Sequence, residues 1–261
     1  MSRYIDVNII VDDILQNGKE IEKLVALAKL LGYDIIAFAT FNPHNIKSIR
    51  EKAVSLSRTY DIDVIVRLSL YTHEIQALKR MLRRYRRYVE LIGVYCVSDK
   101  ITNFAAKDHR VDMITLALGP KIRVKFDDAK ANLLLQGETA LEFVFWDSLR
   151  SISSQTYLPL RLWTYIAKSY EIPIIISSGA RCSLELRDPK VLEAFLKIIL
   201  GIADIASHDF LLSRIATNRE KMEGKIPIPG VKVFGKGDYI AFHKEAIFSI
   251  QNYKPKWPID R

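Results

Sequence analysis

The chain repeats one pattern of hydrophobic and polar positions between Tyr4 and Arg214: a short run rich in Val and Ile, a polar turn, and an amphipathic helix. This alternation predicts parallel β-strands joined by crossover helices. The predicted strands are Tyr4–Val11, Asp34–Thr40, Asp63–Leu70, Leu91–Val97, Asp112–Leu118, Ala140–Trp146 and Pro173–Ser178, followed by a weak eighth near Ala203–Ala206.

The number of units bears on the choice between two α/β folds. Seven or eight units in 261 residues favour a closed, TIM-like (β/α) barrel, because such barrels usually take about 250 residues. An open doubly wound sheet would give a similar pattern and is the alternative. We expect a barrel domain over residues 1–222, with functional groups on the loops that follow the strands.

The ends of the helices are marked by individual residues. The first predicted helix begins behind Asn17 and stops at Gly32, and Gly201 closes a later helix in the same way. Residues 223–261 change character, because Pro and Gly punctuate short apolar pieces there. We expect this tail either to pack on the barrel or to hang free.

Composition sets the broad class of the protein. With 49% hydrophobic and 26% charged residues, the chain can bury one sizeable core. No apolar run approaches the roughly 20 residues that a membrane span needs, and Arg3 and Asp6 interrupt the first apolar stretch. We therefore expect a cytoplasmic protein that does not enter a membrane. Cys96 and Cys182 are expected to be buried or inert thiols.

The charge balance favours a polyanionic partner, since 39 Lys and Arg against 30 Asp and Glu give a net charge of +9. Six cations fall on one predicted helix, where the apolar positions from Ile75 to Val89 form a stripe that can face the barrel. We expect the cations to flank this stripe outward as a phosphate-binding rail. They are Lys79, Arg80, Arg83, Arg84, Arg86 and Arg87.

A solvated charged face is the alternative interpretation of this helix. Acidic partners are scarce, because Glu74 and Glu90 stand only at its two ends. A second basic cluster follows the fifth predicted strand and consists of Lys121, Arg123 and Lys125. Two interpretations of this cluster remain open. It contacts RNA, or it is structural, with Asp127 and Asp128 capping the next helix and neutralising part of the charge.

The histidines do not form a metal-binding pattern. His44, His73 and His208 follow the second, third and eighth predicted strands, but the sequence has no His-x-His or His-x-x-x-His pair. It also has no Gly-x-Ser-x-Gly elbow, Walker loop or Rossmann glycine fingerprint. We predict neither a metal site nor a catalytic residue, and a carboxylate pair assembled by the fold stays open.

The most specific stretch begins at the seventh predicted strand and reads Ile174-Ile-Ile-Ser-Ser-Gly-Ala-Arg-Cys-Ser-Leu-Glu-Leu-Arg-Asp-Pro-Lys190. A strand, a loop and a helix start of this kind resemble the family of protein subunits of archaeal and eukaryotic ribonuclease P, called protein component three in archaea. Three earlier segments follow the order of the family's motifs. They are Val111-Asp-Met-Ile-Thr, Asn132-Leu-Leu and Ala140-Leu-Glu-Phe-Val.

The resemblance implies a barrel related to metal-dependent phosphoesterases of the polymerase-and-histidinol-phosphatase type. Those hydrolases carry His-x-His on the first strand, where this chain has Asp6-Val-Asn8, so the resemblance implies a lost metal site. It also implies that an RNA subunit removes the 5′ leader from precursor tRNA with its own Mg²⁺, while the protein binds and organises that RNA without a cofactor. The implied partners are the RNase P RNA, a small ferredoxin-like protein subunit, the other protein subunits and, through the complex, precursor tRNA.

Three arginines near the matching motif are candidates for RNA contact. Arg181 and Arg187 lie within the motif, and Arg150 follows the sixth strand a little later than the family's usual arginine. Alternatively, Arg187 pairs with Asp188 or Glu185 to hold the loop. Ser177, Ser178 and Gly179 could present hydroxyl and N–H groups to a phosphate, or Gly179 could simply permit a tight turn.

Two rival functions predict activity from the isolated chain. One is a metal-dependent phosphoesterase that uses His44, His73, Asp204 and His208. The other is a barrel enzyme that binds a small phosphorylated substrate at residues 177–181. An RNA-binding subunit would instead show no turnover alone and would lose affinity steeply with salt.

Overall fold

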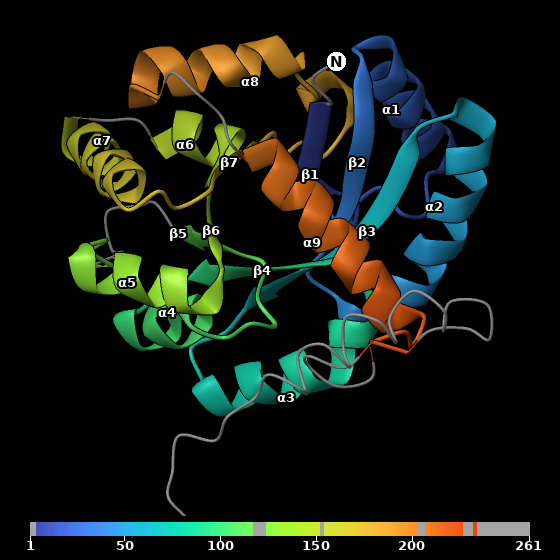
Figure 1. The fold of residues 1–261 in the computed structure, drawn as a ribbon. Coiled ribbons are helices and arrows are strands. Elements are labelled where there is room, and N and C mark those ends of the chain that lie inside the picture. Colours follow the sequence, from blue (N-terminus) through green and yellow to red (C-terminus); the bar gives the residue numbers. More distant parts are fainter. Residues whose placement is uncertain (1–3, 117–123, 152–153, 203–206, 227–231, 234–261) are drawn as a thin grey trace, which may run out of the picture. The chain divides into compact units, whose positions relative to one another are not determined.

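The computed structural model describes residues 4–116, 124–151, 154–202, 207–226 and 232–233. The chain divides into two units, residues 1–218 and 219–261. The first unit is built on seven parallel strands that pair in sequence order (Figure 1). They are β1 (Tyr4–Ile10), β2 (Tyr33–Thr40), β3 (Asp63–Tyr71), β4 (Leu91–Cys96), β5 (Met113–Leu116), β6 (Ala140–Val144) and β7 (Ile174–Ser177).

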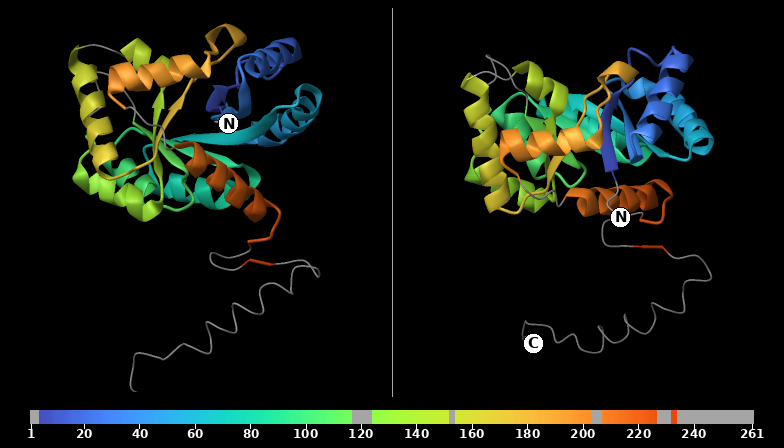
Figure 2. Two further views of the ribbon diagram at one scale, coloured as in Figure 1. Left: turned by 45° about the horizontal axis from the view of Figure 1, so that its top comes forward. Right: turned by 90° about the horizontal axis from the view of Figure 1, so that it is seen from above.

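Helices follow the strands, and those before α9 lie on the outside of the curved sheet (Figures 1 and 2). They are α1 (Gly18–Leu30), α2 (Ile46–Tyr60), α3 (Ile75–Tyr85), α4 (Asp99–Ala106), α5 (Asp128–Gly137), α6 (Phe145–Ser151), α7 (Ser154–Ser169), α8 (Pro189–Phe195) and α9 (Ser207–Met222). Short 3₁₀ turns are η1 (Pro43–Asn45), η2 (Arg86–Tyr88) and η3 (Ser183–Glu185), and η4 (Leu196–Leu200) is a π-helical segment. No described helix is both long and apolar enough to cross a lipid bilayer.

The sheet closes almost completely into a barrel. Beyond β7, the Gly179 amide donates to the Asn8 carbonyl (3.0 Å) and the Ile10 amide donates to the Ala180 carbonyl (2.8 Å). Gly179 has a φ of 68°, and a β-carbon there would lie 2.3 Å from Val144 Cγ1. This turn therefore requires glycine. The predicted TIM-like barrel is confirmed, while the weak eighth strand at residues 203–206 lies outside the described residues.

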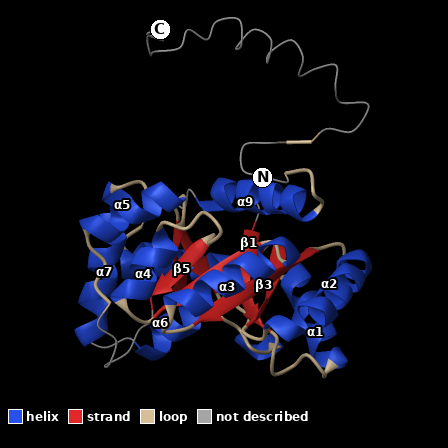
Figure 3. Cartoon of the chain, turned by 90° about the horizontal axis from the view of Figure 1, so that it is seen from below, coloured by secondary structure: helices blue, strands red, loops and turns tan. Residues whose placement is uncertain are grey.

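Two apolar layers hold the barrel, and they follow from the period-two alternation of side chains along each strand. One layer lies between the sheet and the helices and includes Phe38, Leu78 and Leu82. The other lies inside the barrel, where strand residues pack against Leu211 and Ile215 of α9. Figure 3 shows α3 lying across the outside of the strands near β3. Because Leu211 and Ile215 pack on this inner layer, α9 covers one end of the barrel. The strands terminate at the opposite end, where barrels of this kind carry their functional groups.

The predicted sixth strand is wrong at its end, because Phe145 and Trp146 begin α6 instead of extending β6. The Trp146 amide donates to the Ser178 carbonyl (3.2 Å), and its indole N–H donates to the Glu185 carbonyl (2.7 Å). Both acceptors lie after β7, far along the chain. These long-range contacts outweigh the β-preference of two adjacent aromatic residues.

The second unit is described only in part. It contains the last turn of α9 and a short stretch in which the Val233 amide donates to the Lys225 carbonyl (2.7 Å). Lys232 pairs with Glu220 at 2.6 Å. Most of the tail predicted over residues 223–261 lies outside the described residues.

Candidate nucleic-acid interface

A buried ion pair occupies the interior of the barrel. Arg67 on β3 and Glu142 on β6 are both fully buried, and the two guanidinium ends lie 2.5 and 2.6 Å from the two carboxylate oxygens. Arg67 also donates to the Val7 carbonyl (3.1 Å). Gly93 on β4 makes room for this arginine, because a β-carbon there would lie 2.4 Å from Arg67 Nη2. A planar, two-pronged pair of this kind fixes both side chains.

Glu142 is saturated with donors. The hydroxyls of Thr115 and Ser177 donate to it at 2.5 and 2.6 Å, in addition to the two bonds from Arg67. Burial alone would raise the pKa of Glu142, but the charge of Arg67 and these hydrogen bonds outweigh it and hold the pKa below its ordinary value. Glu142 is therefore an ionised structural group and is poorly suited to accept a proton in a reaction.

The predicted histidine positions do not converge. His44 and His73 are exposed on loops after β2 and β3, where the His44 amide donates to Asn42 Oδ1 and His73 packs edge-on against Tyr71. Asp204, which the rival phosphoesterase requires, lies outside the described residues. Among the described residues there is no group of three or more His, Cys, Asp or Glu that could hold a metal ion. The geometry gives no support to a metal-dependent hydrolase.

The Asp6-Val-Asn8 segment helps to close the barrel between β1 and the end of β7. Asp6 Oδ1 accepts from the amides of Asn8 and Ser178, both at 3.1 Å, and Asn8 Nδ2 donates to the Tyr95 hydroxyl at 3.3 Å. Burial raises the pKa of the Asp6 carboxyl, and hydrogen bonds from Ser178 and Asn8 oppose the rise. Asp6 therefore joins β1 to the end of β7 at an electrostatic cost.

Replacing Asp6 with Asn is expected to stabilise the protein relative to the native chain as pH rises from about 4 to about 7. The folded Asp6 carboxyl has the higher pKa, so its contribution to stability is lost as pH rises above the unfolded value of about 3.9. The amide does not titrate. Urea unfolding of both proteins across this range measures the difference, with Glu22→Gln on α1 as the control. A difference that stays constant with pH would contradict the assignment.

Two arginines lie against one tryptophan at the open end of the barrel, and a third arginine follows on the loop after β7. The guanidinium carbons of Arg187 and Arg150 lie 4.6 and 5.4 Å from the Trp146 ring centroid. Arg150 pairs with Glu185 at 2.8 Å, and Arg181 approaches Asp13 at 3.4 Å. We call Arg150, Arg181 and Arg187 the mouth arginines. Their charge is only partly balanced here, so an anionic ligand would be attracted.

The alternative pairing of Arg187 is wrong in detail. Its guanidinium donates to the carbonyls of Leu184 (2.8 Å) and Leu186 (3.1 Å), and no contact with the Asp188 or Glu185 carboxylates is present within the described chain. Instead, Asp188 caps α8 by accepting from the Lys190 amide at 2.8 Å. Arg187 thus holds the loop through backbone carbonyls while its face lies against Trp146.

The prediction that residues 177–179 present donors to a phosphate is wrong. Ser177 and Ser178 are fully buried, and the Ser177 hydroxyl is used by Glu142. The Ser178 hydroxyl accepts from the Ala180 amide at 3.1 Å, and the Gly179 amide donates to the Asn8 carbonyl. The turn therefore faces inward, and the simple interpretation of Gly179 as a turn residue is the correct one.

A small cavity lies beside the mouth arginines. It has a volume of about 250 Å³ and is lined in part by Tyr95, Thr115, Asp147, Ser148 and Arg150. Burial and the nearby charge of Glu142 raise the pKa of Asp147. Pockets for drug-sized ligands usually measure about 300–1,000 Å³, so this cavity suits a smaller group. Residues 177–181, at which the rival barrel enzyme would bind its substrate, do not line this cavity.

The α3 helix presents an exposed basic surface, as the sequence predicted. Its apolar side packs as expected, since Leu78 and Leu82 are fully buried. Lys79 lies over the Phe104 ring and Arg84 over the Tyr85 ring, at 5.3 and 5.4 Å from the ring centroids. Within the described residues, no carboxylate pairs with Arg80, Arg83 or Arg84. We call five cations the α3 face: the half-buried Lys79, the exposed Arg80, Arg83 and Arg84, and the exposed Arg87 of the adjoining η2.

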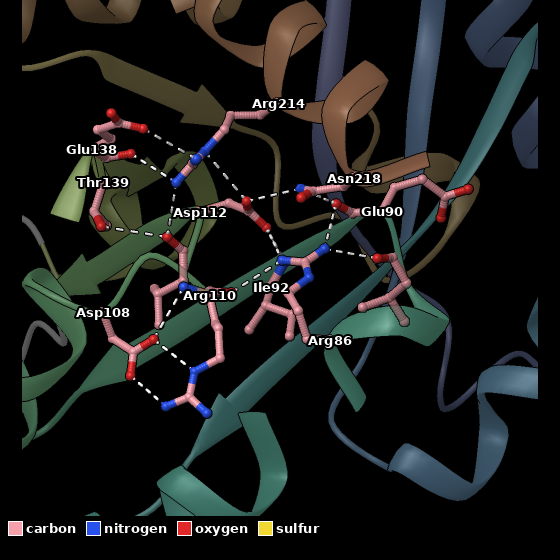
Figure 4. Close-up of polar contacts among 12 residues, drawn as sticks. Arg86, Glu90, Ile92, Asp108, Arg110, Asp112, Glu138, Thr139, Arg214 and Asn218 are labelled. Carbon is pink, nitrogen blue, oxygen red and sulfur yellow. Dashed lines mark hydrogen bonds and ion pairs between the residues drawn. The ribbon is translucent and has the colours of Figure 1, made fainter. Parts of the chain in front are cut away.

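Arg86 does not belong to this face, and the prediction that it points outward is wrong. It is buried, and Nη1 lies 2.5 Å from Asp112 Oδ2 while Nη2 donates to the carbonyls of Val89 and Glu90 at 2.7 Å (Figure 4). Asn218 of α9 bonds the same Asp112 at 3.0 Å, and Arg214 approaches it at 3.5 Å. The switch to a 3₁₀ turn at η2 places Arg86 on the inner side. Arg86 is a structural residue that ties η2, β5 and α9 together.

The second basic cluster is only partly visible. Lys121 and Arg123 lie outside the described residues, while Lys125 is exposed. Asp127 accepts from the Lys130 amide at 3.0 Å, so it caps α5 as the structural interpretation expected. Lys130 is itself neutralised by Asp99 and Asp127. Capping is thus confirmed, and RNA contact by this cluster stays a prediction.

Comparison with known proteins now decides the family. The family model described as RNase P subunit p30 matches residues 3–216, most of the chain. The chain belongs to the RNase P subunit p30 family. Curated relatives include two proteins named ribonuclease P protein component 3. That of Methanocaldococcus jannaschii is 24% identical over 70% of this chain and 81% of its own length. That of Methanosarcina barkeri is 23% identical over 84% of this chain and 91% of its own length.

Solved structures show that this p30 family member shares its fold with two kinds of protein. A chain in a cryo-EM structure of archaeal ribonuclease P with mature tRNA has a TM-score of 0.70 at 19% identity, covering 89% of this chain and 98% of that one. A candidate histidinol phosphatase from Listeria monocytogenes has a TM-score of 0.52 at 9% identity, covering 70% and 97%. The p30 barrel thus shares the architecture of a hydrolase, while its described residues lack a metal cluster.

Proposed function

We propose that this chain is a non-catalytic protein subunit of ribonuclease P that binds and organises the RNA of that enzyme. The observation that carries the proposal is the family match over residues 3–216, on a chain whose exposed basic surfaces fit an RNA ligand. The net charge of +9 adds a general attraction for polyanions. We infer that the protein works in the cytoplasm.

The α3 face supports the binding role by its chemistry. Four of its five cations are arginines, which can contact phosphate oxygens with two parallel N–H groups. They stand on an exposed helical surface whose opposite side is anchored by Leu78 and Leu82. An RNA backbone lying along this helix would meet a row of preplaced donors.

The mouth arginines offer a second contact of a different kind. Arg150 and Arg187 lie near the Trp146 ring, and both carry planar guanidinium groups that can stack on an unpaired base as well as bind a phosphate. This surface lies where a barrel enzyme would have its active site. We infer that a former catalytic end now serves as a binding surface.

The chemistry is assigned to the RNA. Glu142 is held ionised by Arg67, and no cluster of ligands for a metal occurs in the described part of the barrel. We propose that the Mg²⁺ ions needed for removal of the 5′ leader are held by the RNA and that this chain holds none. The partners would be the RNase P RNA, a small ferredoxin-like protein subunit, other protein subunits and, through the assembly, precursor tRNA.

A reconstitution assay tests this function. The purified chain alone is expected to leave 5′-labelled precursor tRNA intact at every Mg²⁺ concentration. When it is added to the RNase P RNA and the other protein subunits, it is expected to lower the Mg²⁺ concentration needed for leader removal. An omission mixture without this chain is the control. Cleavage by the isolated chain, or no change in the Mg²⁺ requirement, would overturn the proposal.

A further inference from the structure

Helix α7 exposes a row of large apolar side chains. Leu158, Leu162 and Tyr165 are 69%, 54% and 71% exposed. Their spacing of four and three residues places them on one side of the helix. The opposite side packs normally, since Leu160 and Ala167 are buried. We call Leu158, Leu162 and Tyr165 the α7 stripe. A contiguous apolar patch on a soluble protein commonly marks an interaction surface.

A groove runs beside the α7 stripe. It has a volume of about 550 Å³ and lies between α7 and residues 200–202. Leu162 and Tyr165 line it, and Gly201, with a φ of 75°, forms its other wall. The Thr164 hydroxyl lies between the two walls, 2.8 Å from the Arg161 carbonyl and 3.1 Å from the Leu200 carbonyl. The groove is therefore built into the barrel domain and can receive a projecting side chain.

The surroundings of the groove are cationic. Arg161 and Lys168 line it, and Lys197 is exposed on the neighbouring η4. In the part of the chain that the structure describes, none of these three forms an ion pair with a carboxylate. A matching ligand would therefore combine an apolar anchor with carboxylates around it.

These features identify the class of occupant. A second copy of this chain would bring the same cations face to face across a two-fold axis, which opposes pairing. The chain's own residues 234–261 carry five Lys and Arg against three Asp and Glu, so their net charge repels the groove. An RNA backbone would match the cations but would leave the leucines exposed to solvent. A surface on another protein, with an apolar side chain set between acidic residues, satisfies both requirements.

We propose that the α7 stripe and its groove are the docking surface for another protein subunit, which inserts an apolar side chain beside Leu162 and places carboxylates against Arg161 and Lys168. The inference rests on the proposed function, because that function supplies the protein partners. It separates the protein-binding surface on α7 from the RNA-binding α3 face. The two surfaces can then be disabled independently.

The test compares Leu162→Glu with Leu30→Glu in the full-length chain. Both leucines are exposed, but Leu30 lies on α1, away from the α7 stripe. Each variant is mixed with the other RNase P protein subunits of the same organism, and binding is measured by titration. Leu162→Glu is expected to weaken binding by about tenfold or more, because the glutamate would be buried at an apolar contact, whereas Leu30→Glu is expected to leave binding unchanged. Lys168→Glu should weaken binding without removing an apolar group.

Affinity for the RNase P RNA is measured in parallel. Unchanged RNA binding together with lost subunit binding supports the inference. Equal subunit binding by Leu162→Glu and the native chain would overturn it, as would loss of self-association or RNA affinity in that variant with the protein contacts intact. Failure of the native chain to bind either the RNA or any subunit would sink the proposed function itself, and the inference with it.

Discussion

Replacing Arg67 with Met is expected to lower the free energy of unfolding by about 3–5 kcal/mol. The substitution leaves the Glu142 carboxylate inside the barrel with only the hydroxyls of Thr115 and Ser177 to compensate its charge. A domain is stable by about 5–15 kcal/mol in total, so a large share of the stability would be lost. Urea unfolding followed by far-UV circular dichroism measures the effect.

Two further variants distinguish the loss of the Arg67–Glu142 ion pair from the general effect of losing an arginine. Arg110→Met removes a partner of Asp108 in a more exposed ion pair, and it is expected to cost about 1 kcal/mol or less. The double variant Arg67→Met with Glu142→Leu removes both charges, so it is expected to regain much of the lost stability. If Arg67→Met were no worse than Arg110→Met, the carboxylate would not depend on its buried partner.

Changing the four arginines of the α3 face to Ala is expected to weaken binding of the RNase P RNA by about a thousandfold at low salt. Two unit charges about 4 Å apart in water attract by about 1 kcal/mol, and about 1.4 kcal/mol corresponds to a factor of ten. Each lost phosphate contact also reduces the slope of log K against log salt by about 0.7–0.9. Filter-binding titrations at several salt concentrations measure both quantities.

A charge-matched control is available on α1 and α2, the helices that precede α3 in the chain. Lys19 and Lys23 on α1 and Lys47 and Arg58 on α2 are exposed, and changing them to Ala removes the same four charges. This control is expected to shift affinity slightly through the net charge and to retain most of the salt slope. Equal losses of RNA affinity in the two quadruple variants would mean that binding depends only on the total charge of the protein. Arg86 is left unchanged in both, because its loss would disturb folding.

The architecture could be predicted because its signals are local. The Val and Ile runs of β1 to β4 begin and end close to the expected residues, and Asn17 and Gly32 mark the ends of the first helical segment as expected. The inner side of α3 was also predictable, since a stripe such as Leu78 and Leu82 repeats with the period of the helix. Periodicity and helix-end signals depend only on neighbours in the sequence, so they can be recognised without knowledge of the tertiary structure.

The errors concern side chains whose partners are distant in sequence. The burial of Arg86 depends on Asp112, 26 residues away. The inward turn of Ser177 depends on Glu142, 35 residues away. A single charge in the middle of an otherwise apolar strand was an available signal for the Arg67–Glu142 pair. Sequence reasoning missed it because pattern alone does not say that two such charges meet across a barrel.

The Arg67–Glu142 pair also limits what descendants of this protein can become. Metal-dependent hydrolysis would need ion-binding groups inside the barrel, and Arg67 fills that space with positive charge. Removing the arginine first would give an unstable intermediate with an unpaired buried carboxylate, and removing the glutamate first would leave the arginine buried without its partner. Such a change thus requires coordinated substitutions, which selection acting on one mutation at a time rarely produces.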